Sequence, residues 1–268
     1  MKRASEKFCA WGGIAFAVIF FIGFVGIARF FPPLSPADTA EQTAAIYREH
    51  TNAIRTGLLL CYIGTMFFLA FGSGIVGQTR RIRGVAPAIT FFQISSYASA
   101  VLLIILPLIC WFTAAFRPDE WSPESVRLMN DLGWIGFVIG FPPFVTWVVA
   151  TGVAILSDRA EQPLYPRWSG YLGVCMGFIQ VMAAVLIFFK VGPFAWNGLV
   201  PWYIPFTDFF AWFVVITVLT LKAINKPGYE AAADAESTAR ATSAAASRPG
   251  ADEYAAAVDP QSPASVRR

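Results

Sequence analysis

The sequence predicts an all-α fold: a polytopic membrane helix bundle with six transmembrane helices and both termini in the cytoplasm. Composition is the first observation, because the 268 residues are 56% hydrophobic and only 14% charged, with 25 Phe. Mean hydropathy is +0.57, and an average soluble domain is about 25% charged. These values are typical of an integral membrane protein. They exclude a disordered chain and a disulfide-rich miniprotein.

The distribution of charge along the chain is the second observation. Asp, Glu, Lys, Arg and His are absent from five long stretches, and a sixth contains only Asp208. About 20 apolar residues in a helix cross the hydrocarbon core, and a helix satisfies its own backbone hydrogen bonds in lipid. We therefore predict spans near residues 11–30, 56–78, 86–113, 132–157, 168–189 and 202–222.

The first span follows Lys2, Arg3 and Lys7, as the apolar core of a secretory signal peptide would. Its apolar core is longer than that of a usual signal peptide, and Gly26-Ile27-Ala28 is a poor cleavage site. We therefore expect a retained span, with cleavage as the alternative.

Basic residues predict the orientation of the bundle, since cytoplasmic loops are enriched in Lys and Arg. One side of the predicted membrane carries ten of them: Lys2, Arg3, Lys7, Arg80, Arg81, Arg83, Arg159, Arg167, Lys222 and Lys226. The other side carries six, in longer loops: Arg29, Arg48, Arg55, Arg117, Arg127 and Lys190. We therefore place both termini in the cytoplasm, which agrees with an even number of spans.

Two loops on the outer side carry a Ser-Pro pair that predicts the start of a helix. Ser35 with Pro36 begins one, and Ser122 with Pro123 begins the other, because Ser is a favoured N-cap and Pro a favoured first residue.

Glycine and proline predict how the spans pack and bend. Gly136 with Gly140 in span four, and Gly173 with Gly177 in span five, have the spacing that lets helices approach closely. We expect these two spans to pack on each other, with a dimer face as the alternative. Pro107 in span three and Pro142-Pro143 in span four predict kinks.

The chain divides into a transmembrane domain over 1–225 and a tail over 226–268. Residues 223–268 contain 15 Ala and no apolar periodicity. Such a segment buries too little apolar surface to offset its ordering entropy, so we predict a disordered cytoplasmic tail. An Ala-rich helix over 229–246 is the alternative.

The usual catalytic and metal-binding patterns are missing. His50 is the single histidine, the four cysteines form no CxxC, and no phosphate-binding or hydrolase motif occurs. Cys61 and Cys110 leave a disulfide geometrically open, although four buried thiols are the simpler expectation. The basic run TRRIRG beside a span is a topology determinant and predicts no nucleic-acid partner. We therefore expect no cofactor and no metal, and we lean against an enzyme.

Polar residues at the outer ends of the spans form the candidate site. They could build an outward-facing pocket with an aromatic wall and a charged floor, from Arg29, Arg55, Asp131, Lys190, Trp196, Asn197 and Asp208. The alternative is an interfacial belt whose charges extend to water. Asp208 lies about six residues into its span, and we expect an ion pair with Lys190 or Arg29 because an unpaired carboxylate there is costly.

Several short segments resemble recurring features of a group of six-span bacterial inner-membrane proteins of unknown function. They are PPLSP, IRTGLLL, QTRRI, NDLGW, YPRWSGYLG and GPFAWNG, and the resemblance extends over about residues 10–222. It implies a multi-pass location in the bacterial plasma membrane and transfers no catalytic residue.

Three function classes stay open. The first is a non-enzymatic accessory or small-molecule-binding membrane protein, whose partners are the lipid bilayer and a small apolar ligand. The second is a transporter for a small, largely apolar solute, for which neither a duplicated half nor midplane charge is visible. The third is an intramembrane enzyme using the outer-side carboxylates Asp131 and Asp208. The oligomeric state is not determined by the sequence.

Overall fold

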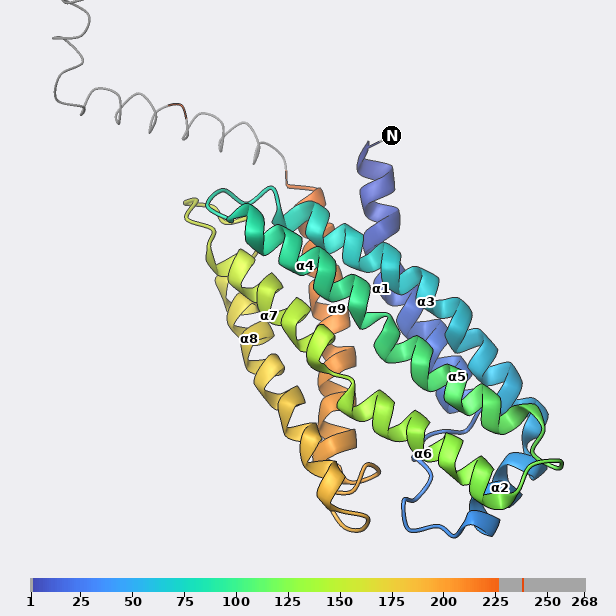
Figure 1. Cartoon of the computed structure of the whole chain (residues 1–268). Coiled ribbons are helices and arrows are strands. Elements are labelled where there is room, and N and C mark those ends of the chain that lie inside the picture. Colours follow the sequence, from blue (N-terminus) through green and yellow to red (C-terminus); the bar gives the residue numbers. More distant parts are fainter. Residues whose placement is uncertain (1, 227–237, 239–268) are drawn as a thin grey trace, which may run out of the picture. The chain divides into compact units, whose positions relative to one another are not determined.

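The computed structural model describes residues 2–226 and Thr238, and the elements it defines there are helices (Figure 1). The longer helices are α1 (Lys2–Phe21), α2 (Ala40–Glu49), α3 (Thr51–Thr79), α4 (Pro87–Ala100), α5 (Leu102–Phe116), α6 (Pro123–Ile139), α7 (Pro142–Leu156), α8 (Arg167–Val181) and α9 (Ile204–Ile224). Three short irregular helices join them: η1 (Ile22–Ile27), η2 (Met182–Phe188) and η3 (Leu199–Tyr203).

Six helical runs are long and apolar enough to cross a membrane. They are Arg3–Ile27, Thr51–Thr79, Pro87–Phe116, Pro123–Leu156, Arg167–Phe188 and Leu199–Ile224. The predicted all-α bundle of six apolar helices is therefore confirmed. The predicted tail lies outside the described residues, apart from Lys226 and Thr238.

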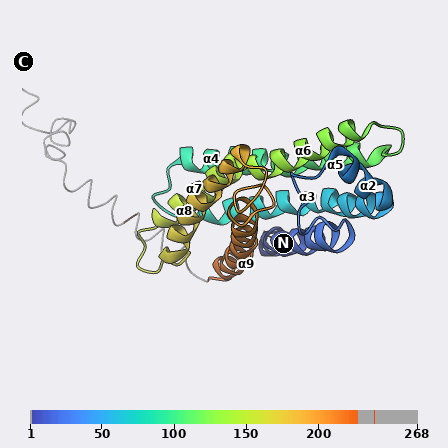
Figure 2. The same cartoon turned by 90° about the horizontal axis from the view of Figure 1, so that it is seen from below.

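The six spans form a closed ring in which each packs against its neighbours in sequence. Span one (α1) contacts span two (α3), α4 contacts α7, α5 contacts α6, and α7 contacts α8. The last span, α9, closes the ring between α8 and α1, as Figure 2 shows from the α2 end. We call the end with loops 28–39, 117–122 and 189–198 the α2 end, and the opposite end the N-terminal end.

Span four is broken where the sequence predicts it. α6 ends at Ile139 and α7 begins at Pro142, so Gly140 and Phe141 lie between two helical halves. Proline has no N–H to continue the preceding helix, and it is well suited to the first position of a new one. Span three divides at Val101, ahead of Pro107.

One of the two predicted helix starts is confirmed and the other is corrected. Ser122 is the N-cap of α6, and its side chain accepts a hydrogen bond from the Ser125 N–H at 3.3 Å. The helix expected from Ser35 begins instead at Ala40, capped by Thr39. The reason is a capping box, in which Thr39 and Gln42 bond each other's backbone N–H groups.

The span-five glycines pack against span four, as predicted. A Cβ on Gly170 would lie 3.0 Å from the Gly152 carbonyl oxygen, and one on Gly173 would lie 3.2 Å from that of Val148. The span-four pair was assigned to the wrong neighbour. Gly136 and Gly140 face Pro107 and Leu103 of span three, because the break at Phe141 gives the two halves of span four different neighbours.

Two groups of aromatic side chains fill the ring. The Phe24 cluster lies towards the α2 end and comprises Phe24, Phe30, Trp111, Trp134, Phe137 and Trp202, with ring centroids 4.9 Å apart in the closest pair. The Phe213 cluster comprises Phe68, Phe71, Trp147, Trp212 and Phe213. Phe16 and Phe20 connect the two clusters. Such contacts stabilise by about 0.5–1.5 kcal/mol per pair beyond area burial.

The four cysteines are free thiols, so Cys61 and Cys110 form no disulfide in the structure. Cys61 is buried, as expected, whereas Cys9 and Cys110 are half-buried and Cys175 is exposed. The lipid-facing side of a span accepts a small apolar thiol as readily as the core does.

Candidate functional site

The interior of the ring contains a cavity with aromatic walls, which we call the aromatic cavity. Its volume is about 70 Å³, measured as the space open to the centre of a water-sized sphere. A cavity needs about 10–15 Å³ to hold one water. The cavity therefore has room for a small organic molecule. Residues from five of the six spans line it: Phe16, Phe20, Leu103, Ile104, Phe137, Val138, Phe141, Phe144, Gln180, Pro201, Trp202, Pro205, Phe206, Phe209 and Phe210.

The sequence brings these rings together by helical spacing and by breaks in the helices. Phe206, Phe209 and Phe210 recur at the three- and four-residue spacing that places side chains on one helical face. From span four, Phe137 of α6 and Phe144 of α7 line the same cavity. The break at Phe141 lies between them, so both halves of span four reach the same cavity.

Polar groups at the edge of the aromatic cavity are few. Gln180 of α8 lines it, is 7% exposed, and donates a hydrogen bond from Nε2 to the Pro205 carbonyl oxygen at 3.0 Å. The same amide interacts with the carboxyl group of Asp208 on α9. Asp208 Oδ2 is buried and has no hydrogen-bond partner.

The expected ion pair of Asp208 does not form among the described residues. Lys190 and Arg29 are exposed, and neither has a nitrogen within 4.0 Å of an Asp208 oxygen. Arg29 has a φ of 59°, the left-handed region that few non-glycine residues adopt. At this point the chain leaves η1 and turns Phe30 into the Phe24 cluster.

Asp131 lies in a second polar group, centred on its neighbour Asn130. The Asn130 side-chain oxygen accepts hydrogen bonds from Tyr47 Oη and Trp134 Nε1, each at 3.1 Å, and its amide nitrogen donates to Asp131. Lys190 is one of the basic residues whose charge acts on Asp131. The structure therefore brings Lys190 towards Asp131 rather than towards Asp208.

Tyr47 is fully buried in this group. Burial raises the pKa of Tyr47 well above its ordinary value, and the negative charge of Asp131 acts in the same direction. The hydroxyl is therefore a neutral donor at all physiological pH values. It joins α2 to α6 through Asn130.

Trp196 and Asn197 lie in the loop before η3. The Trp196 indole N–H donates to the Leu34 carbonyl oxygen at 2.7 Å, which holds this loop against the segment after span one. Trp196 is buried and Asn197 half-buried. Neither residue lines the aromatic cavity, so their geometry is that of a loop anchor.

Arg55, the remaining predicted residue, lines a separate polar hollow at the α2 end, which we call the arginine groove. It offers about 510 Å³ by the same measure. Its lining residues come from the junction of α2 and α3 and from the loop after α5: Arg48, Glu49, His50, Thr51, Asn52, Ala53, Arg55, Phe116, Arg117, Pro118, Asp119 and Glu120.

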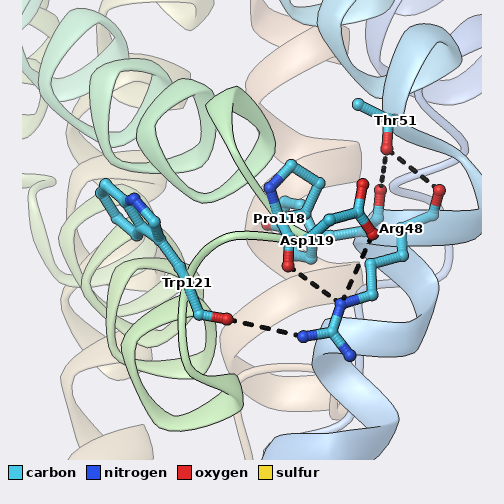
Figure 3. A network of polar contacts seen from close by, with 6 residues as sticks. Arg48, Thr51, Pro118, Asp119 and Trp121 are labelled. Atoms are coloured by element: carbon cyan, nitrogen blue, oxygen red, sulfur yellow. Dashed lines mark hydrogen bonds and ion pairs between the residues drawn. The ribbon is translucent and has the colours of Figure 1, made fainter.

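The arginines of this groove are occupied by groups of the same chain. Arg48 Nε donates to the Pro118 carbonyl oxygen at 2.9 Å and lies 3.8 Å from Asp119 Oδ1, while its Nη2 approaches the Trp121 carbonyl (Figure 3). Arg55 donates to the carbonyl oxygens of Ala115 and Phe116, at the C-terminal end of α5. Cations there also complement the helix dipole, so the groove braces the α5–α6 loop.

The side chains of these sites limit the ligands that they could hold. Within the described part of the chain, no three His, Cys, Asp or Glu side chains converge to hold a metal ion. The aromatic cavity offers apolar surface, ring faces, one amide and a neighbouring carboxyl group, and its lining residue Trp202 has a buried indole N–H without a hydrogen-bond partner. Such a lining fits the general pattern of small-molecule sites, which are mostly apolar with a few placed polar groups.

Sequence reasoning missed the aromatic cavity and the role of Asn130. The spacing of Phe206, Phe209 and Phe210 was a usable signal for an aromatic face, although it did not show which residues of the other spans line the cavity with them. Asn130 carried no signal, because only the fold brings Tyr47 and Trp134 to its side chain. Of the seven predicted site residues, Arg55 alone lines either of the two cavities described above.

Comparison with protein-family models, with characterised proteins and with solved structures finds no match to this chain.

Proposed function

We propose that this chain is a multi-pass protein of a bacterial plasma membrane that binds a small, largely apolar molecule in the aromatic cavity and catalyses no reaction itself. The observation that carries the proposal is the aromatic cavity, which is lined by rings from several spans and has a single amide on its wall. A membrane bundle without a ligand gains nothing from such a space, since close packing of the same side chains is more favourable.

Irregular backbone around the aromatic cavity supports a binding role. Pro201 and Trp202 belong to the π-helix η3, and Phe141 lies in the break of span four. π-Helical turns and helix breaks interrupt regular hydrogen bonding, and π-helical turns are frequent at functional sites. Three independent features, the rings, η3 and the break, therefore coincide at one place.

The proposed orientation has both termini in the cytoplasm and the α2 end outside. It rests on the ten basic residues at the N-terminal end against six at the other. Reporter fusions after Arg83 and Lys222 should report a cytoplasmic location, and a fusion after Asp119 an external one. An external reading after Lys222 would contradict this orientation.

Photolabelling with halothane tests the binding site directly, because this compact apolar molecule reacts with adjacent aromatic side chains when irradiated. We expect labelling of the peptide that contains Trp202–Phe210. The variant Val138→Phe, which fills the aromatic cavity from α6, should remove most of that label.

The matched control is Val153→Phe on α7, since Val153 is 39% exposed on the surface of the bundle. It should leave the label on Trp202–Phe210 unchanged. Thermal unfolding checks that the wild type and Val138→Phe are both folded. Equal labelling of this peptide in the two folded proteins would place the bound halothane outside the aromatic cavity and refute the proposal.

A further inference from the structure

We propose that the ligand of the aromatic cavity is a small organic cation, such as a quaternary or protonated amine, and that Asp208 supplies its counter-charge. This inference rests on the function proposed above and specifies the chemical class of the ligand. It starts from the acidic residue in α9 that the fold leaves without a basic partner.

Asp208 is half-buried within the last span, and its Oδ2 atom is buried without a hydrogen-bond partner. No ion pair joins it to a Lys, Arg or His side chain in the part of the chain that the structure describes. Ionisable residues within a span are costly and usually pair with a neighbour or mark a ligand path. A partner from outside the chain accounts for this carboxylate.

The position of Asp208 is next to the aromatic cavity. Pro205 and Phe209, which precede it by three residues and follow it by one, line the cavity, and so does Gln180, whose amide interacts with the Asp208 carboxyl group. Asp208 itself is not part of the wall. Its charge therefore acts on the cavity from the edge, through surroundings of low dielectric constant that screen it weakly.

The aromatic walls favour the same class of ligand. The face of an aromatic ring is electrostatically negative, and quaternary ammonium groups are recognised by cages of such rings. Nine of the lining residues are Phe or Trp: Phe16, Phe20, Phe137, Phe141, Phe144, Trp202, Phe206, Phe209 and Phe210. An anion would meet both the ring faces and the carboxylate unfavourably. A neutral apolar molecule would leave Asp208 without a partner.

The size of the aromatic cavity is compatible with a free small cation. The centre of a water-sized sphere has about 70 Å³ open to it, which is room for more than one water. This is the scale of a choline-like head without a glycerol backbone. The inference is limited to a free organic cation of this size.

The test compares choline with dimethylbutanol, its uncharged carbon isostere, on the full chain in a maltoside detergent that carries no ammonium group. Binding is measured by saturation-transfer NMR. We expect choline to bind at least tenfold more tightly than dimethylbutanol. Asp208→Asn should reduce this difference severalfold and leave dimethylbutanol binding unchanged, whereas Asp208→Glu should retain the preference for choline. An undiminished preference in Asp208→Asn would show that Asp208 does not supply the counter-charge.

The matched control is Asp119→Asn, which removes an exposed carboxylate from the arginine groove and should not alter choline binding. Equal binding of choline and dimethylbutanol to the wild type would overturn the cation assignment and leave the proposed function standing. If neither choline nor dimethylbutanol bound, the cation assignment would again be refuted, and halothane labelling would decide the proposed function separately. If halothane labelling of Trp202–Phe210 were also absent, the proposed function would fail with it.

A competition experiment separates the two sources of a quaternary ammonium group. Tetramethylammonium should displace choline, because it carries the cation alone. Displacement by a short-chain phosphatidylcholine without displacement by tetramethylammonium would assign the site to a lipid headgroup and overturn the proposal of a free cation.

Discussion

The arginine groove and the aromatic cavity are two hollows of the same bundle, and they differ in how the charged groups in or beside them are satisfied. In the groove, Arg48 and Arg55 donate to backbone carbonyl groups of the α5–α6 connection. Beside the aromatic cavity, the Asp208 Oδ2 atom has no hydrogen-bond partner. The comparison teaches that charge alone does not identify a site. A charge satisfied by its own chain braces the fold, whereas an unsatisfied one is available to a ligand.

The largest expected effect is at Asn130, which supports the groove end of the bundle. Asn130→Leu leaves the buried donors Tyr47 Oη and Trp134 Nε1 without their acceptor. An unsatisfied buried donor costs about 1–3 kcal/mol, so the free energy of unfolding should fall by about 3 kcal/mol. Denaturant unfolding in mixed micelles measures this loss. Asn52→Leu, at an exposed position, is the control and should change little.

A smaller loss is expected at Arg55 in the groove. Arg55→Met removes two donors from the carbonyl groups of Ala115 and Phe116 while keeping the apolar stem. The site is half-exposed, so we expect a loss of about 1–2 kcal/mol, below the full range for charged hydrogen bonds. Thermal unfolding compares it with Arg127→Met, which replaces an exposed arginine. Equal midpoints for the two variants would mean that the groove does not brace the loop.

The smallest effect on stability is expected at Asp208. This variant tests most directly the contrast between the satisfied arginines of the groove and the unpaired carboxylate. The paired carboxylate expected from the sequence would make Asp208→Asn destabilising, because a buried cation would lose its partner. The structure provides no such cation, and removing an ionisable group from a span relieves a cost. We therefore expect unfolding free energy to stay within about 1 kcal/mol of wild type, on the stabilised side. A loss comparable with that of Arg55→Met would show that Asp208 is braced within the chain after all.

Much of the fold followed from local sequence because the determining interactions are local. A span is recognised from the length of a charge-free stretch, the start of α6 from Ser122 and Pro123, and the break of span four from Pro142. In each case the cause is a backbone donor, a cap or the cost of charge in lipid. Even so, the start of α2 was misplaced, since Ser35-Pro36 and Thr39 with Gln42 are competing caps and the capping box satisfies more N–H groups.

The sequence by itself determined the six apolar helices, the break in span four and the presence of one carboxylate in the last span. Only the tertiary structure decided that Gly136 faces span three, that Asn130 joins Tyr47 to Trp134, and that Asp208 lies beside Gln180 and next to the aromatic cavity. The physical reason is that composition along one segment sets the cost of placing a charge in lipid or an apolar surface in water. The partner that offsets this cost comes from another segment, and the closing of the helix ring selects it.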